Sequence, residues 1–249
     1  RMQEAGLKAR LSKPIVIYRE AISQSYQGPS VMGKSPNKHN KLWITLERLS
    51  DDVIEALREN KISEMQKRDE RQTMLRGFGW VTDDARNVIS IEGTNVLVNR
   101  IKGKQYVEEV LDHVKSGFRE AVHESVLAKE PAYGLKVNLE DISVHEDPVH
   151  RGPAQIMPMT QRAIFACFMS ANPTLLEPVQ KITVKAPPDL LGAATSVISQ
   201  KRGKVLSVEQ KGHLVYVVGE LPTSETFDLS EVMRGASAGR AFWGLEFSH

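Results

Sequence analysis

Residues 182–218 read ITVKAPPDLLGAATSVISQKRGKVLSVEQKGHLVYVV, and their pattern decides the fold of the carboxy-terminal part of the chain. Apolar alternation predicts a strand around 182–184, and a helical pattern follows over 188–200. Two further strands are predicted over 205–208 and 214–218, joined by a Lys-Gly turn. The order is therefore strand, helix, strand, strand.

A helical stretch over 227–233 and a strand over 241–247 complete this part. The six elements give the order βαββαβ, which is the ferredoxin-like split motif. The preceding stretch, NPTLLEP at 172–178, contains two prolines and is typical of a linker. We therefore predict two domains of the α+β class, with a boundary near residue 174.

The amino-terminal part mixes strands and helices. Periodicity predicts strands over 14–22, 41–49, 88–91, 96–98 and 135–144, and helices from Ser50 through Leu57, over 61–76, over 104–129 and from about 160 to 171. In the last strand, apolar positions alternate through Leu139 and then continue one step out of phase at Ile142, which indicates a β-bulge.

The composition sets limits on the class of protein. The chain has 249 residues and a net charge of +2, so any nucleic-acid contact has to come from local patches. A single cysteine, Cys167, excludes an intramolecular disulfide framework and favours a reducing compartment. The apolar run at 163–169 is too short to span a bilayer, and residues 1–14 lack a signal-peptide core. We expect a soluble, cytoplasmic chain.

Residues 28–35, GPSVMGKS, fit the spacing of a phosphate-binding P-loop. Such a loop opens a helix, but Pro36 disfavours helical backbone at Ser35, and a strand pattern follows instead of a helix. A nucleotide-binding enzyme that uses Lys34 and Ser35 is therefore the weaker alternative.

The same region suits contact with a phosphate backbone. No acidic residue lies between Ala21 and Leu46, whereas Lys34, Lys38, His39 and Lys41 lie within eight residues. The other interpretation of this segment is a solvated hairpin connection.

A second polar segment, HEDPVHRGPAQ at 145–155, follows the strand that ends near residue 144. Its prolines and Gly152 predict a stiff, irregular loop that displays His150 and Arg151 together. The spacing of His145 and His150 matches no common zinc motif, so a metal site there is the weaker alternative.

A basic turn lies between the first helix and second strand of the βαββαβ segment. It consists of Lys201, Arg202, Gly203 and Lys204. Contact with RNA and a solvated helix end are both compatible with this turn.

Four stretches together resemble the elongation factor 2 family of archaea and eukaryotes, which is related to bacterial elongation factor G. They are PIVIYRE, KSPNKHN, SGFREAVHESVLAKEPAYGLKVNLEDISVH and HEDPVHRGPAQIMP. The Gly-Pro-Ala sequence at 152–154 is closest to the archaeal members, and the resemblance covers nearly the whole chain.

The resemblance implies a domain plan. Residues 1–12 match the tail of the family's third domain, 13–174 match the fourth domain, and 175–249 match the fifth. The fourth domain has a split β-α-β fold like domain 2 of ribosomal protein S5, and the fifth is ferredoxin-like. The GTPase domain, with its GTP and magnesium, would lie outside this chain.

The resemblance also assigns roles to residues. The basic loop matches one that reaches the decoding centre, and His150 occupies the position of diphthamide, a modified histidine that ADP-ribosylating toxins attack. The residues that match its surroundings are His145, Asp147, Arg151 and Gly152. Pro148 departs from the family pattern.

The implied function is mechanical. The parent factor drives tRNA and mRNA through the ribosome, and this part carries no catalytic residue and no cofactor. Expected partners are the rRNA of both subunits, tRNA, mRNA and the diphthamide-synthesis enzymes, with the chain a monomer without membrane contact. A stand-alone RNA-binding module is the alternative.

Overall fold

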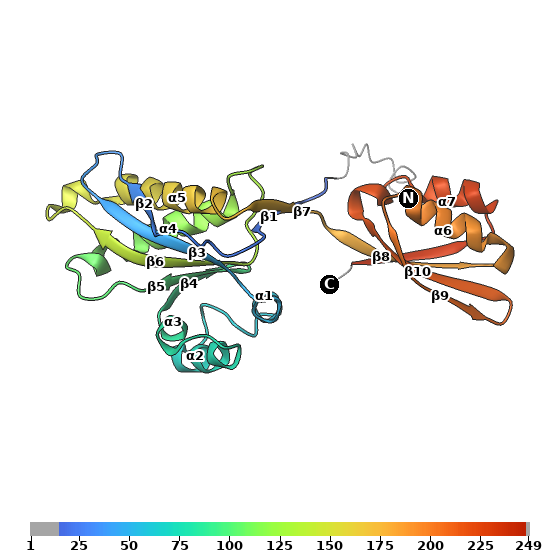
Figure 1. Ribbon diagram of the computed structural model, residues 1–249, viewed down its shortest axis with the longest axis horizontal. Helices are drawn as coiled ribbons and strands as arrows, with labels where there is room; N and C mark the ends of the chain where they lie inside the picture. The colour runs from blue at the N-terminus through green and yellow to red at the C-terminus, as the bar shows by residue number, and fades with distance from the viewer. Residues whose placement is uncertain (1–14, 248–249) are drawn as a thin grey trace, which may run out of the picture. The chain divides into compact units, whose positions relative to one another are not determined.

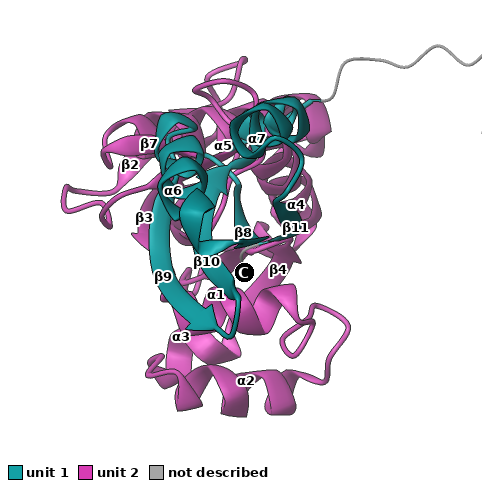
Figure 2. Cartoon of the chain, turned by 90° about the vertical axis from the view of Figure 1, so that its right-hand side faces the viewer, with its two compact units in different colours: residues 1–18, 177–249 teal, residues 19–176 magenta. Residues whose placement is uncertain are grey.

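The computed structural model of the chain describes residues 15–247. They form two compact units, which Figure 2 colours separately. The large unit comprises residues 19–176, and the described residues of the small unit are 15–18 and 177–247. The boundary lies between Leu176 and Glu177, close to the sequence estimate at residue 174. Residues 1–12, assigned to a preceding domain, lie outside the described residues.

The small unit has the predicted βαββαβ order. Its elements are β8 (Val179–Ala186), the 3₁₀ turn η2 (Pro188–Leu190), α6 (Leu191–Gln200), β9 (Lys204–Lys211), β10 (Leu214–Pro222), the 3₁₀ turn η3 (Thr223–Thr226), α7 (Leu229–Ser237) and β11 (Phe242–Phe247). The antiparallel sheet has the order β11-β8-β10-β9, which confirms the ferredoxin-like prediction.

Alternation along β8 explains how this sheet buries one face. Ile182, Val184 and Ala186 are at most 2% exposed, and they belong to one core with Ile198 of α6 and Met233 of α7. Successive strand residues point to opposite faces, so the residues between them lie on the other side of the sheet.

The large unit is built on a five-stranded sheet with the order β2-β3-β6-β5-β4. The strands are β2 (Val31–Lys34), β3 (Lys41–Arg48), β4 (Val88–Glu92), β5 (Asn95–Asn99) and β6 (Leu135–Ser143). All neighbours pair antiparallel except β5 and β6, which are parallel and joined through helix α4. This β5-α4-β6 crossover is the β-α-β unit of the domain.

Helices cover both faces of this sheet (Figure 1). Helices α4 (Val107–His123) and α5 (Pro153–Met169) share one hydrophobic core with Leu42, Ile44 and Leu46 of β3. Helices α1 (Asp51–Arg58), α2 (Arg68–Gly77) and α3 (Thr82–Arg86) belong to a second core with Val96 and Val98 of β5. The sheet is therefore the middle layer of three.

The predicted bulge in β6 is confirmed. Trp43 of β3 pairs with Asp141, and the next residue, Ile44, pairs with Leu139. Glu140 is thus left without a partner in the ladder, and the apolar alternation resumes at Ile142 on the core side.

The sequence placed several helix ends wrongly. The helix predicted over 104–129 ends at His123, because the following loop is held by the buried Glu20. The Glu20 carboxylate accepts hydrogen bonds from the backbone N–H groups of Leu127, Ala128 and Glu130 at 2.8, 2.7 and 3.1 Å. These bonds favour a turn over further helix.

The helix predicted over 61–76 begins only at Arg68, because Arg71 donates to the carbonyls of Ser63 and Glu64 and holds 61–67 as a loop. In α1, Ser50 occupies the N-cap position, but its side chain makes no capping hydrogen bond.

The structure also differs from the prediction of a linker at 172–178 and of a strand over 14–22. The stretch 172–178 contains strand β7 (Pro173–Leu176), which pairs with β1 (Arg19–Ile22). The strand predicted over 14–22 is limited to β1, since β7 pairs only with those four residues. Such pairing depends on a partner about 150 positions away in the sequence, which local patterns do not reveal.

Across residues 15–247, no helix combines the length and the apolar character needed to cross a membrane.

A network of charges lies where α3 meets the sheet. Asp84 of α3 is 4% exposed and accepts hydrogen bonds from Lys136 at 2.7 Å and from Arg100 at 2.6 Å. Arg100 also binds Glu140, and Lys136 also binds Glu47. Burial by itself raises the pKa of the Asp84 carboxyl, but the hydrogen bonds and charges of Arg100 and Lys136 outweigh it and lower the pKa.

This network predicts an acid-sensitive contribution to stability. Because the pKa of Asp84 is lowered in the folded state, its contribution is present above the ordinary aspartate pKa and is lost as the pH falls through the folded-state pKa. We expect Asp84→Asn to lower the free energy of unfolding by about 3 kcal/mol at pH 7, since it removes one partner of the buried Lys136 and of the half-buried Arg100.

Urea denaturation followed by tryptophan fluorescence at pH 7 and pH 3 measures both effects, and the difference from the wild type should shrink at pH 3. Asp83→Asn is the matched control, because Asp83 pairs with Lys102 on the surface. Equal effects of the two substitutions at pH 7 would contradict the role given to the network.

Candidate nucleic-acid interface

The strand directions bring three loops to one edge of the large sheet. Strand β6 runs antiparallel to β3 and parallel to β5, so the β2–β3 turn and the carboxyl ends of β5 and β6 lie together. We call residues 34–41, which are the β2–β3 turn and the lysine on either side of it, the hairpin loop, and residues 144–152 the histidine loop. The connection at 100–106, between β5 and α4, is the third segment at this edge (Figure 1).

The P-loop spacing at 28–35 does not form a P-loop. Residues 31–34 are strand β2, Lys34 pairs with Lys41 across the hairpin, and no helix follows Ser35. A Cβ atom on Gly33 would lie 2.5 Å from the Met159 carbonyl oxygen, so this glycine allows β2 to pack against α5. The nucleotide interpretation of Lys34 and Ser35 is therefore wrong.

The predicted basic residues do lie at this edge. Lys34, Lys38 and His39 are exposed, and Lys41 is half-buried. Among the described ion pairs, none involves Lys34, Lys38 or Lys41. Three cations without an acidic partner leave a local positive charge that the net charge of +2 does not reveal.

The histidine loop is more ordered than the sequence predicted. Residues 148–150 form a 3₁₀ turn, η1, and the Asp147 carboxylate caps it by accepting from the Val149 N–H at 3.0 Å. Gly152 is the N-cap of α5, and Pro153 is the first residue of that helix. Proline is well tolerated at this position, because a backbone N–H in the first turn of a helix has no hydrogen-bond partner within the helix, so nothing is lost when proline lacks it.

Arg151 is not displayed, which corrects the prediction. It is 5% exposed, and its guanidinium donates to the carbonyls of His145 at 2.8 Å and Glu146 at 2.6 Å. The same group forms an ion pair with Glu109 and lies over the ring of Tyr106, 4.4 Å from its centroid. Arg151 therefore fixes the shape of the loop, while its neighbour His150 remains half-buried at the surface.

The hairpin loop and the histidine loop are hydrogen-bonded to each other. The side-chain amides of Asn37 and Asn40 both donate to the His150 carbonyl at 2.8 Å. In return, the Asn40 side-chain oxygen accepts from the His145 N–H at 2.9 Å. The sequence alone does not indicate either asparagine, because nothing in the local pattern points to a partner about 110 residues away.

Three imidazoles gather where the loops meet. The ring centroids of His39, His145 and His150 lie 4.6 to 5.1 Å from one another. The His145 Nδ1 atom accepts a hydrogen bond from the Asp147 N–H at 3.0 Å. Within residues 15–247, no three potential ligands are arranged to hold a metal ion, so the metal alternative gains no support.

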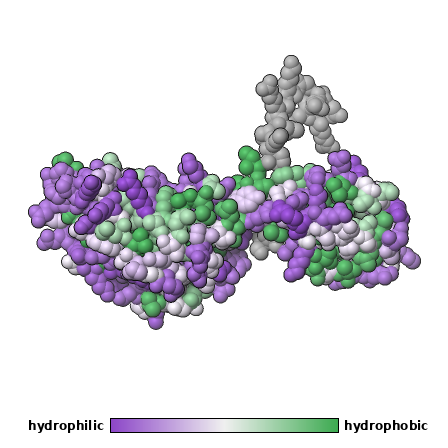
Figure 3. Space-filling model, turned by 45° about the horizontal axis from the view of Figure 1, so that its top comes forward, coloured by the Kyte–Doolittle hydropathy of each residue, from purple (hydrophilic) through white to green (hydrophobic). Residues whose placement is uncertain are grey.

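The hydropathy of the surface agrees with a polar contact region. In the face drawn in Figure 3, the loop end of the large unit is mostly hydrophilic. Such a surface is suited to water, phosphate and ribose rather than to an apolar partner.

The basic turn of the small unit is neutralised within that unit. Lys201 binds Asp228 at 2.6 Å, and Arg202 binds Glu177 at 3.0 Å and Glu225 at 2.8 Å. Lys201 and Arg202 are therefore paired with acids of the small unit, and of the two interpretations of this turn, contact with RNA gains no support from them. Lys204 is exposed.

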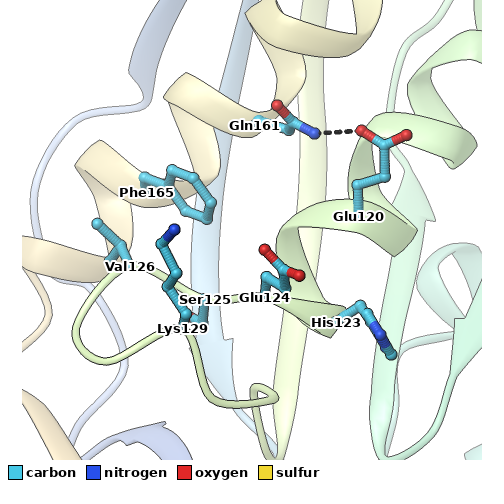
Figure 4. A pocket seen from close by; sticks show the side chains of 8 residues that line it. All are labelled: Glu120, His123, Glu124, Ser125, Val126, Lys129, Gln161 and Phe165. Carbon is cyan, nitrogen blue, oxygen red and sulfur yellow. Dashed lines mark hydrogen bonds between the residues drawn. The ribbon is translucent and has the colours of Figure 1, made fainter.

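A hollow of about 550 Å³ lies at the other end of α4 and α5 (Figure 4). Its lining comprises Glu120, His123, Glu124, Ser125, Val126, Lys129, Gln161 and Phe165. The Gln161 amide donates to the Glu120 carboxylate across one side of it. Among the described hydrogen bonds, none joins the Ser125 hydroxyl to His123 in this lining, and no set of metal ligands is found among residues 15–247.

The single cysteine is not a catalytic nucleophile. Cys167 lies in α5 and is fully buried, and burial raises the pKa of its thiol to about 12. The reactive thiolate is therefore scarce at neutral pH.

Family models match both units. Residues 59–172 match the model for elongation factor G, domain IV, and residues 174–249 match the model for the elongation factor G C-terminus.

Curated archaeal proteins are similar over nearly the whole chain. The chain is 47% identical over 245 residues to the elongation factor 2 of Staphylothermus marinus, 46% identical to that of Sulfurisphaera tokodaii and 45% identical to that of Saccharolobus solfataricus. Each match covers 98% of this chain and 33% of the relative. The chain thus spans about a third of the length of these relatives.

Proposed function

Because residues 59–172 belong to the elongation factor G domain IV family and residues 174–249 to the elongation factor G C-terminus family, we propose that the chain is the carboxy-terminal part of a translational GTPase. The parent protein moves tRNA and mRNA through the ribosome. Support comes from relatives named elongation factor 2. The chain itself supplies RNA contacts, and GTP hydrolysis belongs to a part of the parent outside it.

One observation carries the proposal for the large unit. Two loops that are bonded to each other present Lys34, Lys38 and Lys41 without acidic partners, beside three imidazoles. Unpaired cations suit phosphates, and imidazole N–H groups suit the 2′-hydroxyls of an A-form minor groove. The proposed target is the codon–anticodon helix and its surrounding rRNA at the decoding centre.

His150 is the proposed site of diphthamide. It lies at the end of a capped 3₁₀ turn, and its carbonyl is held by two amides, so its backbone position is well defined. It is half-buried and not enclosed, which leaves the imidazole within reach of the modifying enzymes. The same reach explains why ADP-ribosylating toxins are proposed as further partners. A cationic modification would strengthen contacts with phosphate.

The small unit is proposed to contact ribosomal RNA and protein, but through fewer basic residues than the sequence predicted. Lys201 and Arg202 are held by acids of their own unit, whereas Lys204 is exposed. The whole factor is proposed to act as a cytoplasmic monomer.

Charge removal at the hairpin loop tests the RNA contact. In the full-length factor, Lys34→Gln with Lys38→Gln should slow translocation and leave GTP binding unchanged, because the missing charges no longer contact phosphate. The slope of log affinity for ribosomes against log salt concentration should fall by about two, one for each lysine.

The matched control replaces Lys67 and Lys181, which are also exposed, by glutamine. Translocation and a salt slope that are the same in the wild type, the test variant and the control would contradict the assignment of the hairpin loop.

Mass spectrometry tests the modification. Trypsin cleaves after Lys136 and Arg151, so one peptide, 137–151, contains both His145 and His150. For the factor purified from its native host, we expect the mass increase of diphthamide, located at His150 by fragmentation, while His145 serves as the internal control. An unmodified His150 would contradict this part of the proposal.

A further inference from the structure

Two uncharged residues of the hairpin loop hold the backbone of His150. We propose that Asn37 and Asn40 are positioning residues that fix His150 and make the hairpin loop and the histidine loop one recognition element. The inference rests on the proposed role of His150 at the tip. It gives the hairpin loop a second task besides supplying positive charge.

The His150 carbonyl has both of its acceptor positions occupied. The Nδ2 atoms of Asn37 and Asn40 each donate to it at 2.8 Å. A carbonyl oxygen accepts two strong hydrogen bonds, so any rotation of this peptide breaks at least one of them. The bonds join positions 113 and 110 residues apart in the sequence.

Reciprocal bonds hold the two loops from both sides. The side-chain oxygen of Asn40 accepts from the His145 N–H at 2.9 Å, and the Gln155 side-chain oxygen accepts from the Asn37 N–H at 2.9 Å. The chain is thus held before His150 at His145 of the histidine loop and after it at Gln155 of α5. Asn40 is fully buried, where an amide that loses its partners is costly.

Ser35 sets the direction of both amides. Its hydroxyl donates to the Asn37 side-chain oxygen at 2.5 Å and accepts from the Asn40 side-chain amide at 3.1 Å. The Asn37 oxygen also accepts from the His39 N–H at 3.1 Å. With its oxygen engaged inside the hairpin loop, Asn37 has its NH₂ group free to face His150. The serine of the P-loop-like spacing therefore has a structural role.

The arrangement of the imidazoles depends on these bonds. His39 comes from the hairpin loop, and its ring lies 5.0 Å from that of His150 and 5.1 Å from that of His145. If the loops separate, His39 moves away and the His150 ring loses one side of its surroundings. The asparagines therefore determine how much of His150 is accessible and where its ring lies.

Accessibility of each histidine in the 249-residue chain tests the inference. Asn40→Asp keeps the oxygen that accepts from His145 but removes the donor to His150, and Asn37→Asp does the same for the second donor. The probe is diethyl pyrocarbonate at pH 8, where unperturbed imidazoles are neutral, with the reaction rate of each histidine measured by peptide mass spectrometry.

We expect the rate at His150 to rise about fivefold in each variant, the factor that corresponds to one net hydrogen bond. The rates at His113, His123 and His213 should stay unchanged, because those residues lie on α4 and in the small unit. Asn60→Asp adds the same charge at an exposed site and should change none of the rates.

Two controls keep the result interpretable. If buried Asn40→Asp disrupts the fold, the rates at His113 and His123 rise as well, and half-buried Asn37→Asp then decides the question. A pH profile of the His150 rate separates altered accessibility from an altered imidazole pKa. A His150 rate in Asn37→Asp equal to that of the wild type would overturn the inference. Since no ribosome is present, that failure would leave the proposed function to its own tests.

Discussion

Parallel pairing of β5 with β6 is the constraint on which the proposed contact surface depends. It requires a crossover through α4, and it places the carboxyl ends of both strands at the edge where the β2–β3 hairpin turns. Segments around residues 37, 105 and 150 thereby become neighbours. Contacts across this edge then fix their positions, as when Arg151 of the histidine loop pairs with Glu109 near the start of α4.

Charge is distributed unevenly over the large unit. Where the sheet meets α3, the cations Arg100 and Lys136 are matched by carboxylates, and Asp84 between them is buried. At the loop edge, Lys34 and Lys38 have no such partners among the described residues. A cation that is already paired gains little from a phosphate, whereas an unpaired one releases counterions on binding. The loop edge is therefore the proposed place of contact with RNA.

The same reasoning separates the two basic segments that the sequence singled out. Lys201 and Arg202 look as basic as Lys34 and Lys38 in the sequence. In the fold, Asp228, Glu177 and Glu225 form ion pairs with the first pair, and no acid within residues 15–247 forms an ion pair with the second. Tertiary contacts decide which cations remain available to bind a phosphate. A count of charges along the sequence does not measure these contacts.

Periodicity predicted the helices and strands that have a regular apolar pattern or that pack against elements close in the sequence. The sequence predicted both the βαββαβ order and the β6 bulge. Apolar residues repeat every second position in strands and about every 3.6 positions in helices, so the two patterns can be told apart. Features that depend on distant partners were not visible. Glu20 ends α4 from about 107 positions away, β7 needs β1, and Arg151 is buried by Tyr106 and Glu109.

Within the proposed site, the sequence indicated the lysines and His150, and the resemblance supplied their roles. The sequence did not indicate the asparagines, since the sequence of a polar loop does not show whether an asparagine side chain in it is solvated or buried. Asn40 is fully buried, and only the fold shows what it holds.

The most direct measurement is hydroxyl-radical probing from the hairpin loop on the ribosome. Cys167 is buried, so an iron chelate attached to a Lys38→Cys variant of the full-length factor, with its other accessible cysteines replaced, reports from the tip of this loop. We expect cleavage of small-subunit rRNA around the decoding centre. Cleavage confined to large-subunit rRNA, or no cleavage by a factor that still binds ribosomes, would contradict it.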